Sequence, residues 1–412
     1  LRTVDSYKPK NASMYSNRFG LDLNAKPTDN VTVTAKLSMY KNFGENDAGA
    51  YTNSGNAPFF ADRVGVFDGT LGHVPSSSYL NVDRAYANWT NIGDQDMWFS
   101  VGRRPSTEGA PKNFKNNEEK PGRGGTPALL VDYAFDGMTL GYAPEIDSLP
   151  GAYGKICYGR GFESGFSEPT GNSLEDTDMV GVAIVPIDTD GLRVWGQWNR
   201  GMNIFDAPKM MNTYFGNTLP KVNLGNIDWV GLGAMGTVKD VGAGKLNWFF
   251  DTGFSRTDPN NNVSAQFGFQ GLLTGAFFSP EAPTGKTGHA IYTGVRYDLP
   301  SKTSFGLEYN YGSKNWITFA PAASDAWTSK VGTRGHVYEA YMIHEFKNKP
   351  ISSRTAKSFV RLGVQYYDFE YTGSNNWVGA PVAIDSVSAA NMLTTTPLDK
   401  AYNIYATLNV KF

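Results

Sequence analysis

Apolar and polar residues alternate along many short segments of the chain. In the C-terminal segment, one face carries Tyr402, Ile404, Ala406, Leu408, Val410 and Phe412, and the other carries Asn403, Tyr405, Thr407, Asn409 and Lys411. A period of two residues predicts a β-strand with one apolar and one polar face. The same alternation recurs at 18–26, 31–39, 246–254, 291–299, 304–311 and 360–366. Because no stretch of a dozen residues shows a helical period, the chain is predicted to be all-β.

Short and long connections follow one another regularly between these segments. Short polar turns are predicted at 26–30, 91–96, 136–137, 188–191, 239–243, 299–302 and 347–357. Long segments rich in Gly, Asn, Ser, Thr and Pro lie at 41–77, 104–127, 144–178, 200–226, 255–287, 313–333 and 371–397. A compact soluble domain rarely carries several connections above about 15 residues. A transmembrane β-barrel does, with short turns at one end and long loops at the other.

Counting strands from this alternation of short and long connections gives fifteen between about residue 14 and Phe412. The first complete strand, near residues 14–25, runs into a short turn, so a strand of opposite direction is expected before it. Residues 1–7 supply at most the end of that strand. We therefore expect a single domain over residues 1–412, a sixteen-stranded transmembrane antiparallel β-barrel whose first strand is largely missing from the given chain. A soluble β-sandwich or propeller is the alternative for the same alternation.

Composition narrows the class of protein further. Charged residues make up 18% of the chain, aromatic residues 14%, and the net charge is −2. The aromatic content argues against disorder, and the mean hydropathy is −0.37. No apolar run reaches the roughly 18 residues that a membrane helix needs. The near-zero net charge gives no support to a nucleic-acid partner.

Two small features of the sequence leave the cellular compartment open. The single cysteine, Cys157, permits no internal disulfide and is interpreted as a packing residue. No secretory signal is visible at Leu1, so a signal has either been removed or the chain is cytosolic.

A spanning barrel needs an apolar face toward lipid and a polar face toward its lumen. Aromatic residues near strand ends are expected at the membrane interfaces: Trp229, Trp248, Phe254, Tyr309, Tyr311, Tyr402 and Phe412. Charges on the polar face are expected in the lumen, because Arg or Lys facing hydrocarbon costs about 2–4 kcal/mol. These lumen-facing candidates are Arg18, Asp22, Lys36, Lys155, Arg193, Asp251, Arg296, Asp298, Glu308, Glu339 and Arg361. The adjacent Asp83 and Arg84 predict a bulge, an interfacial position or one charge toward lipid.

Three segments resemble known proteins. The C-terminal strand AYNIYATLNVKF (401–412) resembles the insertion signal of Gram-negative outer-membrane proteins. The hairpin at 79–105 is similar to the strand pair before the constriction loop of porin-like families. Segment 305–346 looks like a porin-like family of unknown function found in metal-reducing bacteria. The resemblance implies an integral outer-membrane porin, a homotrimer in outer-membrane lipid, which passes small hydrophilic solutes and ions by diffusion and needs no cofactor.

In such porins the third long loop folds into the lumen and narrows it. By position this loop is about 104–127, whose five basic residues outnumber three acidic ones. Since charges at the narrowest point of a pore set its selectivity, a mild anion preference is expected. A loop also carries charge simply because it is solvated. The constriction candidates are Arg103, Arg104, Glu108, Lys112, Lys115, Glu118, Glu119, Lys120 and Arg123.

Other functions have weaker support in the sequence. The fourth long loop carries Glu163, Glu168, Glu175, Asp176 and Asp178, which lack EF-hand spacing and indicate a solvated loop more than a divalent-cation site. No catalytic or metal-binding residue is assigned, because none of the four histidines, His73, His289, His336 and His344, lies in a catalytic motif. A substrate-specific channel would grip its ligand with Tyr214, Phe215, Phe277 and Phe278. A third alternative is a structural or partner-binding barrel, for instance a sheath for a redox protein.

Overall fold

The computed structural model describes residues 6, 8, 10–44, 77–104, 109–121, 129–166, 174–208, 210–213, 216–264, 268–278, 281–320, 325–347, 349, 351, 353, 356–394 and 396–412. Most of these residues are in β-strands. The strands are β1 (Ser16–Thr28), β2 (Val31–Asn42), β3 (Ser77–Thr90), β4 (Met97–Arg104), β5 (Phe135–Tyr142), β6 (Tyr153–Phe162), β7 (Thr177–Asp188), β8 (Leu192–Phe205), β9 (Met210–Thr213), β10 (Gly216–Thr218), β11 (Asn223–Val241), β12 (Gly244–Pro259), β13 (Thr287–Asp298), β14 (Thr303–Gly312), β15 (Gly335–Glu345), β16 (Lys357–Phe369) and β17 (Lys400–Lys411).

Helical segments are few and short. They are α1 (Lys112–Lys115), η2 (Ile92–Asp94), η3 (Lys330–Gly332) and η4 (Ile384–Ser386). None of the helices in the described part of the chain is long and apolar enough to cross a membrane.

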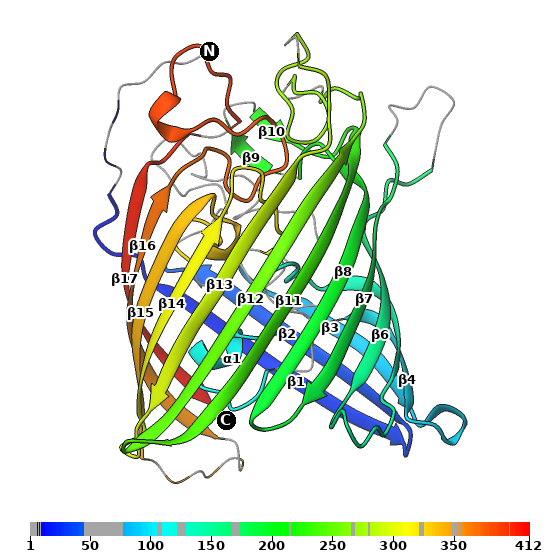
Figure 1. Ribbon diagram of the computed structural model, residues 1–412, viewed down its shortest axis with the longest axis vertical. Helices are drawn as coiled ribbons and strands as arrows, with labels where there is room; N and C mark the ends of the chain where they lie inside the picture. Colours follow the sequence, from blue (N-terminus) through cyan, green and yellow to red (C-terminus); the bar gives the residue numbers. More distant parts are fainter. Residues whose placement is uncertain are drawn as a thin grey trace.

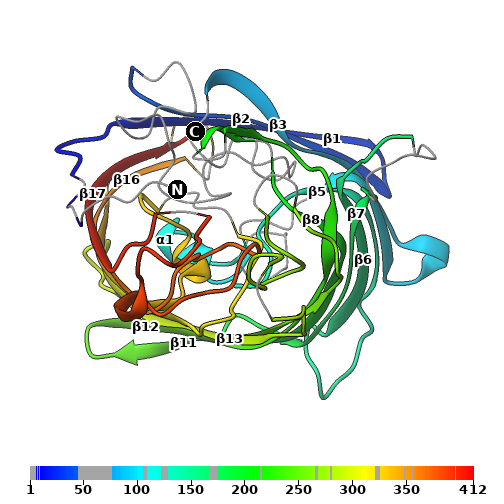
Figure 2. The ribbon, with the colours of Figure 1, turned by 90° about the horizontal axis from the view of Figure 1, so that it is seen from above.

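Fifteen of the strands form one antiparallel sheet, in which each strand pairs with its neighbours in chain order. The exceptions, β9 and β10, make a small hairpin between β8 and β11. Long connections gather at one end of the sheet and short turns at the other (Figure 1). Seen from above, the sheet curves into a ring, and α1 lies inside it (Figure 2). The predicted antiparallel barrel is therefore confirmed, as is the count of fifteen strands up to Phe412.

The apolar face of the sheet is exposed and the polar face is turned inward. In β17, Tyr402, Ile404 and Leu408 are 68%, 76% and 66% exposed, while the polar residues between them are half-buried. In β12, Phe254 is exposed, whereas Asp251 is completely buried on the other face. A sheet with an apolar outer face and a polar inner face is stable when lipid surrounds it, because in water the apolar face would remain exposed.

The connection between β5 and β6 corrects two sequence-based predictions. A turn was expected at 136–137, but Asp136 and Gly137 lie within β5, and β6 occupies part of the predicted loop 144–178. Gly137 is needed because the backbones of β5 and β6 approach closely, and a Cβ there would collide with the carbonyl oxygen of Tyr158. The Asp-Gly pair therefore marks a close strand contact and not a hairpin turn.

The adjacent charges of β3 lie at a β-bulge, one of the three predicted outcomes. Lys36 pairs with Arg84 and Leu37 pairs with Val82, so Asp83 is the extra residue. Asp83 is 1% exposed. Its carboxylate lies 3.8 Å from Lys36 Nζ and 3.6 Å from Arg84 Nε. The bulge therefore buries Asp83 without turning the neighbouring Arg84 toward lipid.

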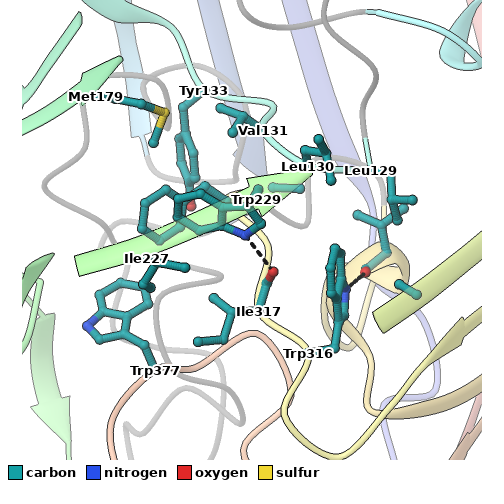
Figure 3. Close-up of a cluster of buried hydrophobic side chains, with 14 of the residues drawn as sticks. Leu129, Leu130, Val131, Tyr133, Met179, Ile227, Trp229, Trp316, Ile317 and Trp377 are labelled. Atoms are coloured by element: carbon teal, nitrogen blue, oxygen red, sulfur yellow. Dashed lines mark hydrogen bonds between the residues drawn. The ribbon is translucent and has the colours of Figure 1, made fainter. Parts of the chain in front are cut away.

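A hydrophobic cluster fills part of the barrel interior, and we call it the interior cluster. It contains Leu129, Leu130, Val131, Ile227, Trp229, Trp316, Ile317, Phe319 and Trp377, all buried (Figure 3). These residues come from β11 and from the β4–β5, β14–β15 and β16–β17 connections. Burying several aromatic side chains stabilises this packing strongly, because each removes a large apolar area from water.

The indole nitrogens of the interior cluster are paired with backbone carbonyls. Trp229 Nε1 donates to Ile317 O at 2.8 Å, and Trp316 Nε1 donates to Val331 O at 2.8 Å (Figure 3). The expected place of Trp229 at a membrane interface is wrong, since its side chain is completely buried inside the barrel. The adjacent Val230 takes the exposed outer face.

Candidate functional site

The third long connection crosses the interior to the wall made by β13, β16 and β17. Arg296 Nη1 of β13 donates to Phe114 O at 2.7 Å, and Arg361 Nη1 of β16 donates to Lys115 O at 2.5 Å. Lys357 Nζ donates to Asn117 O, and Lys411 Nζ reaches Asn116 O at 3.4 Å. These carbonyls belong to the last residues of α1 and the two residues after it, where backbone oxygens attract cations. Four inward-pointing cations of the last strands thus hold α1 in the lumen.

A buried network of charges lies next to α1. Glu308 of β14 and Glu339 of β15 are direct cross-strand partners on the inner face. Lys330 of η3 forms ion pairs with both, at 2.7 Å from Glu339 Oε2. Lys115 Nζ lies 2.6 Å from Glu339 Oε1. Two like charges opposite each other repel, so the two lysines from the connections are needed to neutralise this wall.

Hydroxyl and amide groups also donate hydrogen bonds to the two buried carboxylates. Tyr405 OH donates to Glu339 Oε1 at 2.6 Å, and Gln365 Nε2 donates to Glu339 Oε2 at 3.2 Å. Tyr292 OH donates to Glu308 Oε2 at 2.7 Å. Burial by itself would lower the pKa of Lys330, but the charges of Glu308 and Glu339 outweigh it and raise that pKa well above its usual value.

A second buried cation ties two of the long connections together. Arg334, just before β15, is 1% exposed and donates to Trp316 O, Thr372 O and Asn376 O at 3.1, 3.1 and 2.6 Å. Burial lowers the pKa of Arg334 to about 9. The β14–β15 and β16–β17 connections therefore pack as one unit inside the barrel.

The inner wall of β4, β6 and β8 carries a separate group of cations. Arg104 Nε donates to Ser100 Oγ at 2.6 Å, and its Nη1 donates to Thr139 Oγ1. Arg193 Nη2 donates to Tyr153 OH at 2.6 Å. Lys155 therefore lies beside Arg104 on this wall, apart from the Glu308–Glu339 pair near α1.

The inner face of β1 is exposed, whereas that of β2 is more covered, with Ser38 and Asn42 only 4% and 8% exposed. Asp22 is exposed and in register with Lys36 on β2. Arg18 is also exposed, and its guanidinium lies 4.9 Å from the centre of the Tyr40 ring. The positive charge of Lys36 therefore lies between two acidic residues of neighbouring strands, Asp22 in register on β1 and Asp83 on β3 at 3.8 Å.

The other predicted residues take different positions. Arg103 Nε donates to Asp83 O at 3.0 Å, Lys112 forms an ion pair with Asp132, and Glu118 pairs with Lys411. Lys120 and Glu119 are exposed, with Lys120 Nζ 2.7 Å from Asp190 Oδ1. Arg296 pairs with Asp298 at 2.7 Å. Glu108 and Arg123 lie outside the described residues.

Acidic residues of the fourth long loop surround the side chain of Arg160. Arg160 lies 2.5, 2.7 and 2.9 Å from carboxylate oxygens of Glu163, Asp176 and Asp178. Hydrogen bonds from Ser164 are the largest of the effects that hold the pKa of Asp176 below its usual value. Within the described ranges, no group of His, Cys, Asp and Glu residues is arranged to hold a metal ion. Glu168 falls outside those ranges.

The aromatic residues considered for ligand binding are only partly described. Phe277 and Phe278 are both exposed, with ring centres 5.4 Å apart. Tyr214 and Phe215 lie outside the described residues.

Several important residues were missed by the sequence analysis. Gln365, Tyr405 and Lys411 follow the alternation that predicts inward faces, so the pattern itself could have found them. Lys330 and Arg334 lie in or beside a predicted polar loop, where a charge normally indicates contact with water. No local signal distinguishes these two from solvated residues.

The sequence model of a family described as a protein of unknown function, DUF3373, matches residues 8–412. The chain belongs to this family. No curated protein sequence matches the DUF3373 chain significantly.

Solved structures similar to the DUF3373 chain include three outer-membrane proteins. OmpF of Salmonella typhi, solved with daunomycin, is 10% identical, with 98% of this chain and 93% of that chain covered and a TM-score of 0.47. The anion-selective porin from Comamonas acidovorans is 10% identical, with 96% and 89% covered and a TM-score of 0.43. OmpT of Vibrio cholerae, folded in vitro, is 15% identical, with 95% and 88% covered and a TM-score of 0.43.

The place of the DUF3373 chain in the cell follows from its own strands. Its antiparallel sheet has an exposed apolar exterior and a polar interior, with long connections at one end and short turns at the other. This is the architecture of barrels in the bacterial outer membrane. The chain is an outer-membrane β-barrel.

Proposed function

We propose that this barrel is a passive channel for small hydrophilic solutes and ions across the outer membrane. The observation that carries the proposal is the contrast between two parts of the inner wall. Arg18 and Asp22 on β1 are exposed, while Asp251, Glu308 and Glu339 on the later strands are buried. Exposed charged residues on the inner face of β1 support a hydrated path along this strand.

We further propose that the third long connection narrows this path. Its support is the anchoring of α1 by cations from β13, β16 and β17, which keeps the connection inside the barrel. The charges of the connection that remain solvent-accessible, such as Lys120, would then act on passing ions. Both signs of charge line the interior, which favours weak selectivity over a filter for a single ion.

Planar-bilayer recordings of the purified protein test the channel. We expect ohmic conductance in KCl and a reversal potential near zero in a KCl gradient. Arg18→Glu should move the reversal potential toward cation selectivity, and Asp22→Lys toward anion selectivity. The permeability ratio should change roughly two- to fivefold, because a unit charge at 4 Å in water contributes about 1 kcal/mol.

Arg256→Glu is the matched control, because Arg256 is an exposed residue of β12 beside the buried Ser255 and Thr257. It should leave the reversal potential unchanged. A protein that inserts into the bilayer without any conductance would contradict the proposal. The associated proposal of a homotrimer is tested by the mass of the detergent-solubilised protein from light scattering.

A substrate-specific channel is the second candidate function. The interior cluster favours it, because a packed aromatic core leaves less of the lumen to solutes than an open pore would. Block of the KCl current by a single sugar or organic acid would support this candidate over general diffusion.

A further inference from the structure

A small hollow lies on the inner wall of β4–β8, away from the Glu308–Glu339 network. Its cavity volume is about 40 Å³. Arg104, Lys155, Gln197 and Asn199 supply its polar lining, and Val131 and Phe135 close it from the β4–β5 side. None of the described residues that line it carries a carboxylate. Two cationic side chains therefore share a small space with no carboxylate among the lining residues.

Small residues on the inner faces of β6 and β7 create this hollow. Gly159, Gly181 and Ala183 line it between longer side chains from the neighbouring strands. A Cβ at Gly181 would collide with Asn199 Oδ1, so glycine lets the amide of Asn199 lie flat against β7. The hollow is thus part of the wall and not a gap left by a loop.

Two buried amides of the hollow have polar atoms without a partner. Asn199 and Gln197 are each 7% exposed. In the described part of the chain, Asn199 Nδ2 and Gln197 Oε1 have no hydrogen-bond partner. A buried amide without a partner costs about 1–3 kcal/mol, so such atoms indicate a bound group. The amide of Gln197 presents a second donor when its oxygen and nitrogen are exchanged.

We propose that this hollow binds a small inorganic anion of the halide class, held by Lys155, Arg104 and the amide of Asn199. Lys155 is 9% exposed, so an anion beside it would be largely withdrawn from water. Charge pairing is stronger in such a buried site than in water. The volume exceeds the roughly 10–15 Å³ that one water requires, which leaves room for a single halide ion. A metal cation is disfavoured here because the lining supplies positive charge and no carboxylate.

Bromide, which scatters anomalously, is the probe for this site. Crystals of the whole protein are soaked in sodium bromide, and the anomalous map is calculated for the wild type and two variants. We expect a bromide peak in the hollow of the wild type and no peak there in Lys155→Met or Arg104→Met. Arg193→Met is the matched control, because Arg193 lies on the inner face of β8 but does not line the hollow.

Thermal unfolding in detergent gives a second readout that needs no crystals of the variants. An anion that binds only the folded protein raises its unfolding midpoint. We expect the midpoint in sodium chloride to exceed that in sodium gluconate of equal ionic strength by about 2 °C. The difference should vanish in Lys155→Met and persist in Arg193→Met.

Three results would overturn the proposal. They are a wild-type map in which bromide binds elsewhere but not in the hollow, a hollow occupied only by water, and a peak that survives both Lys155→Met and Arg104→Met. None of these results depends on conductance, so the anion site and the proposed channel are tested independently.

Discussion

The inner faces of β1–β2 and of β14–β15 both carry charged residues in cross-strand register, but they balance those charges differently. On β1 and β2, Asp22 is in register with Lys36, an opposite charge whose Nζ also lies 3.8 Å from the carboxylate of Asp83 on β3. On β14 and β15, Glu308 faces Glu339, a pair of like charges. The second wall is neutral only when Lys330 and Lys115 come in from the connections.

This contrast indicates which parts of the barrel depend on one another. On the β1–β2 wall, opposite charges are supplied by neighbouring strands, and Arg18 and Asp22 are exposed. The β14–β15 wall is complete only with its connections folded inward, and the interior cluster then packs against them. A pair of like charges on neighbouring strands thus marks a wall that is neutralised only by residues of the connections.

The largest expected effect comes from breaking the interior cluster. Trp316 is completely buried, so Trp316→Ala should lower the free energy of unfolding by about 3–5 kcal/mol. Because the packed connections lose their main contact, the conductance should rise. Urea titration and bilayer recordings measure the two effects. Phe250→Ala on the exposed face of β12 is the control, and an equal rise in conductance there would contradict the interpretation.

Removing the cation shared by the two glutamates should have the next largest effect. Lys330→Met leaves Glu308 and Glu339 opposed in a buried site, and we expect a loss of about 3 kcal/mol in urea titration. Adding Glu308→Gln to this variant removes the repulsion and should restore part of the loss. A double variant no more stable than Lys330→Met would show that repulsion is not the cause.

Loss of one hydrogen bond in the same network should have a smaller effect. Tyr405→Phe removes the hydroxyl that donates to Glu339 Oε1 at 2.6 Å. Because Glu339 keeps its two lysine partners, we expect a loss of about 1–2 kcal/mol by urea titration. A loss as large as that of Lys330→Met would mean that the hydroxyl, and not the lysines, governs this wall.

The smallest effect on stability is expected for a substitution on the β1–β2 wall. Asp22 is exposed, so Asp22→Asn should change the free energy of unfolding by less than about 0.5 kcal/mol. The same variant should still shift the reversal potential toward anion selectivity. A large loss of stability would show that Asp22 has a structural partner comparable to that of Glu339.

The alternation of residues predicts strands and their faces well, because lipid contact imposes a strict rule on every second position. The segments of β1, β2, β12–β14, β16 and β17 all follow from it. The sequence pattern fails to predict the connections where a glycine fits both a turn and a close contact between two strands. The sequence predicts a turn at Gly137, but this glycine permits the close contact between β5 and β6.

The filling of the lumen was not predictable from the pattern. An aromatic residue near a strand end suits a membrane interface and an interior core equally well, and Trp229 takes the second place because Ile317 and Phe319 pack there. Trp316 and Trp377 lie in segments whose composition is otherwise that of a polar loop. Whether such a loop folds inward depends on contacts with strands far away in the chain.

The cations that hold α1 also set an order of events during folding. Phe114 and Arg296 are 182 residues apart in the chain, and Asn116 and Lys411 are 295 apart. Contacts between such distant residues close a large loop and form late. The third connection can therefore make its full set of contacts only after β17 has been added. A chain that stops before β17 would keep the contacts of Arg296 and Arg361 and lose that of Lys411.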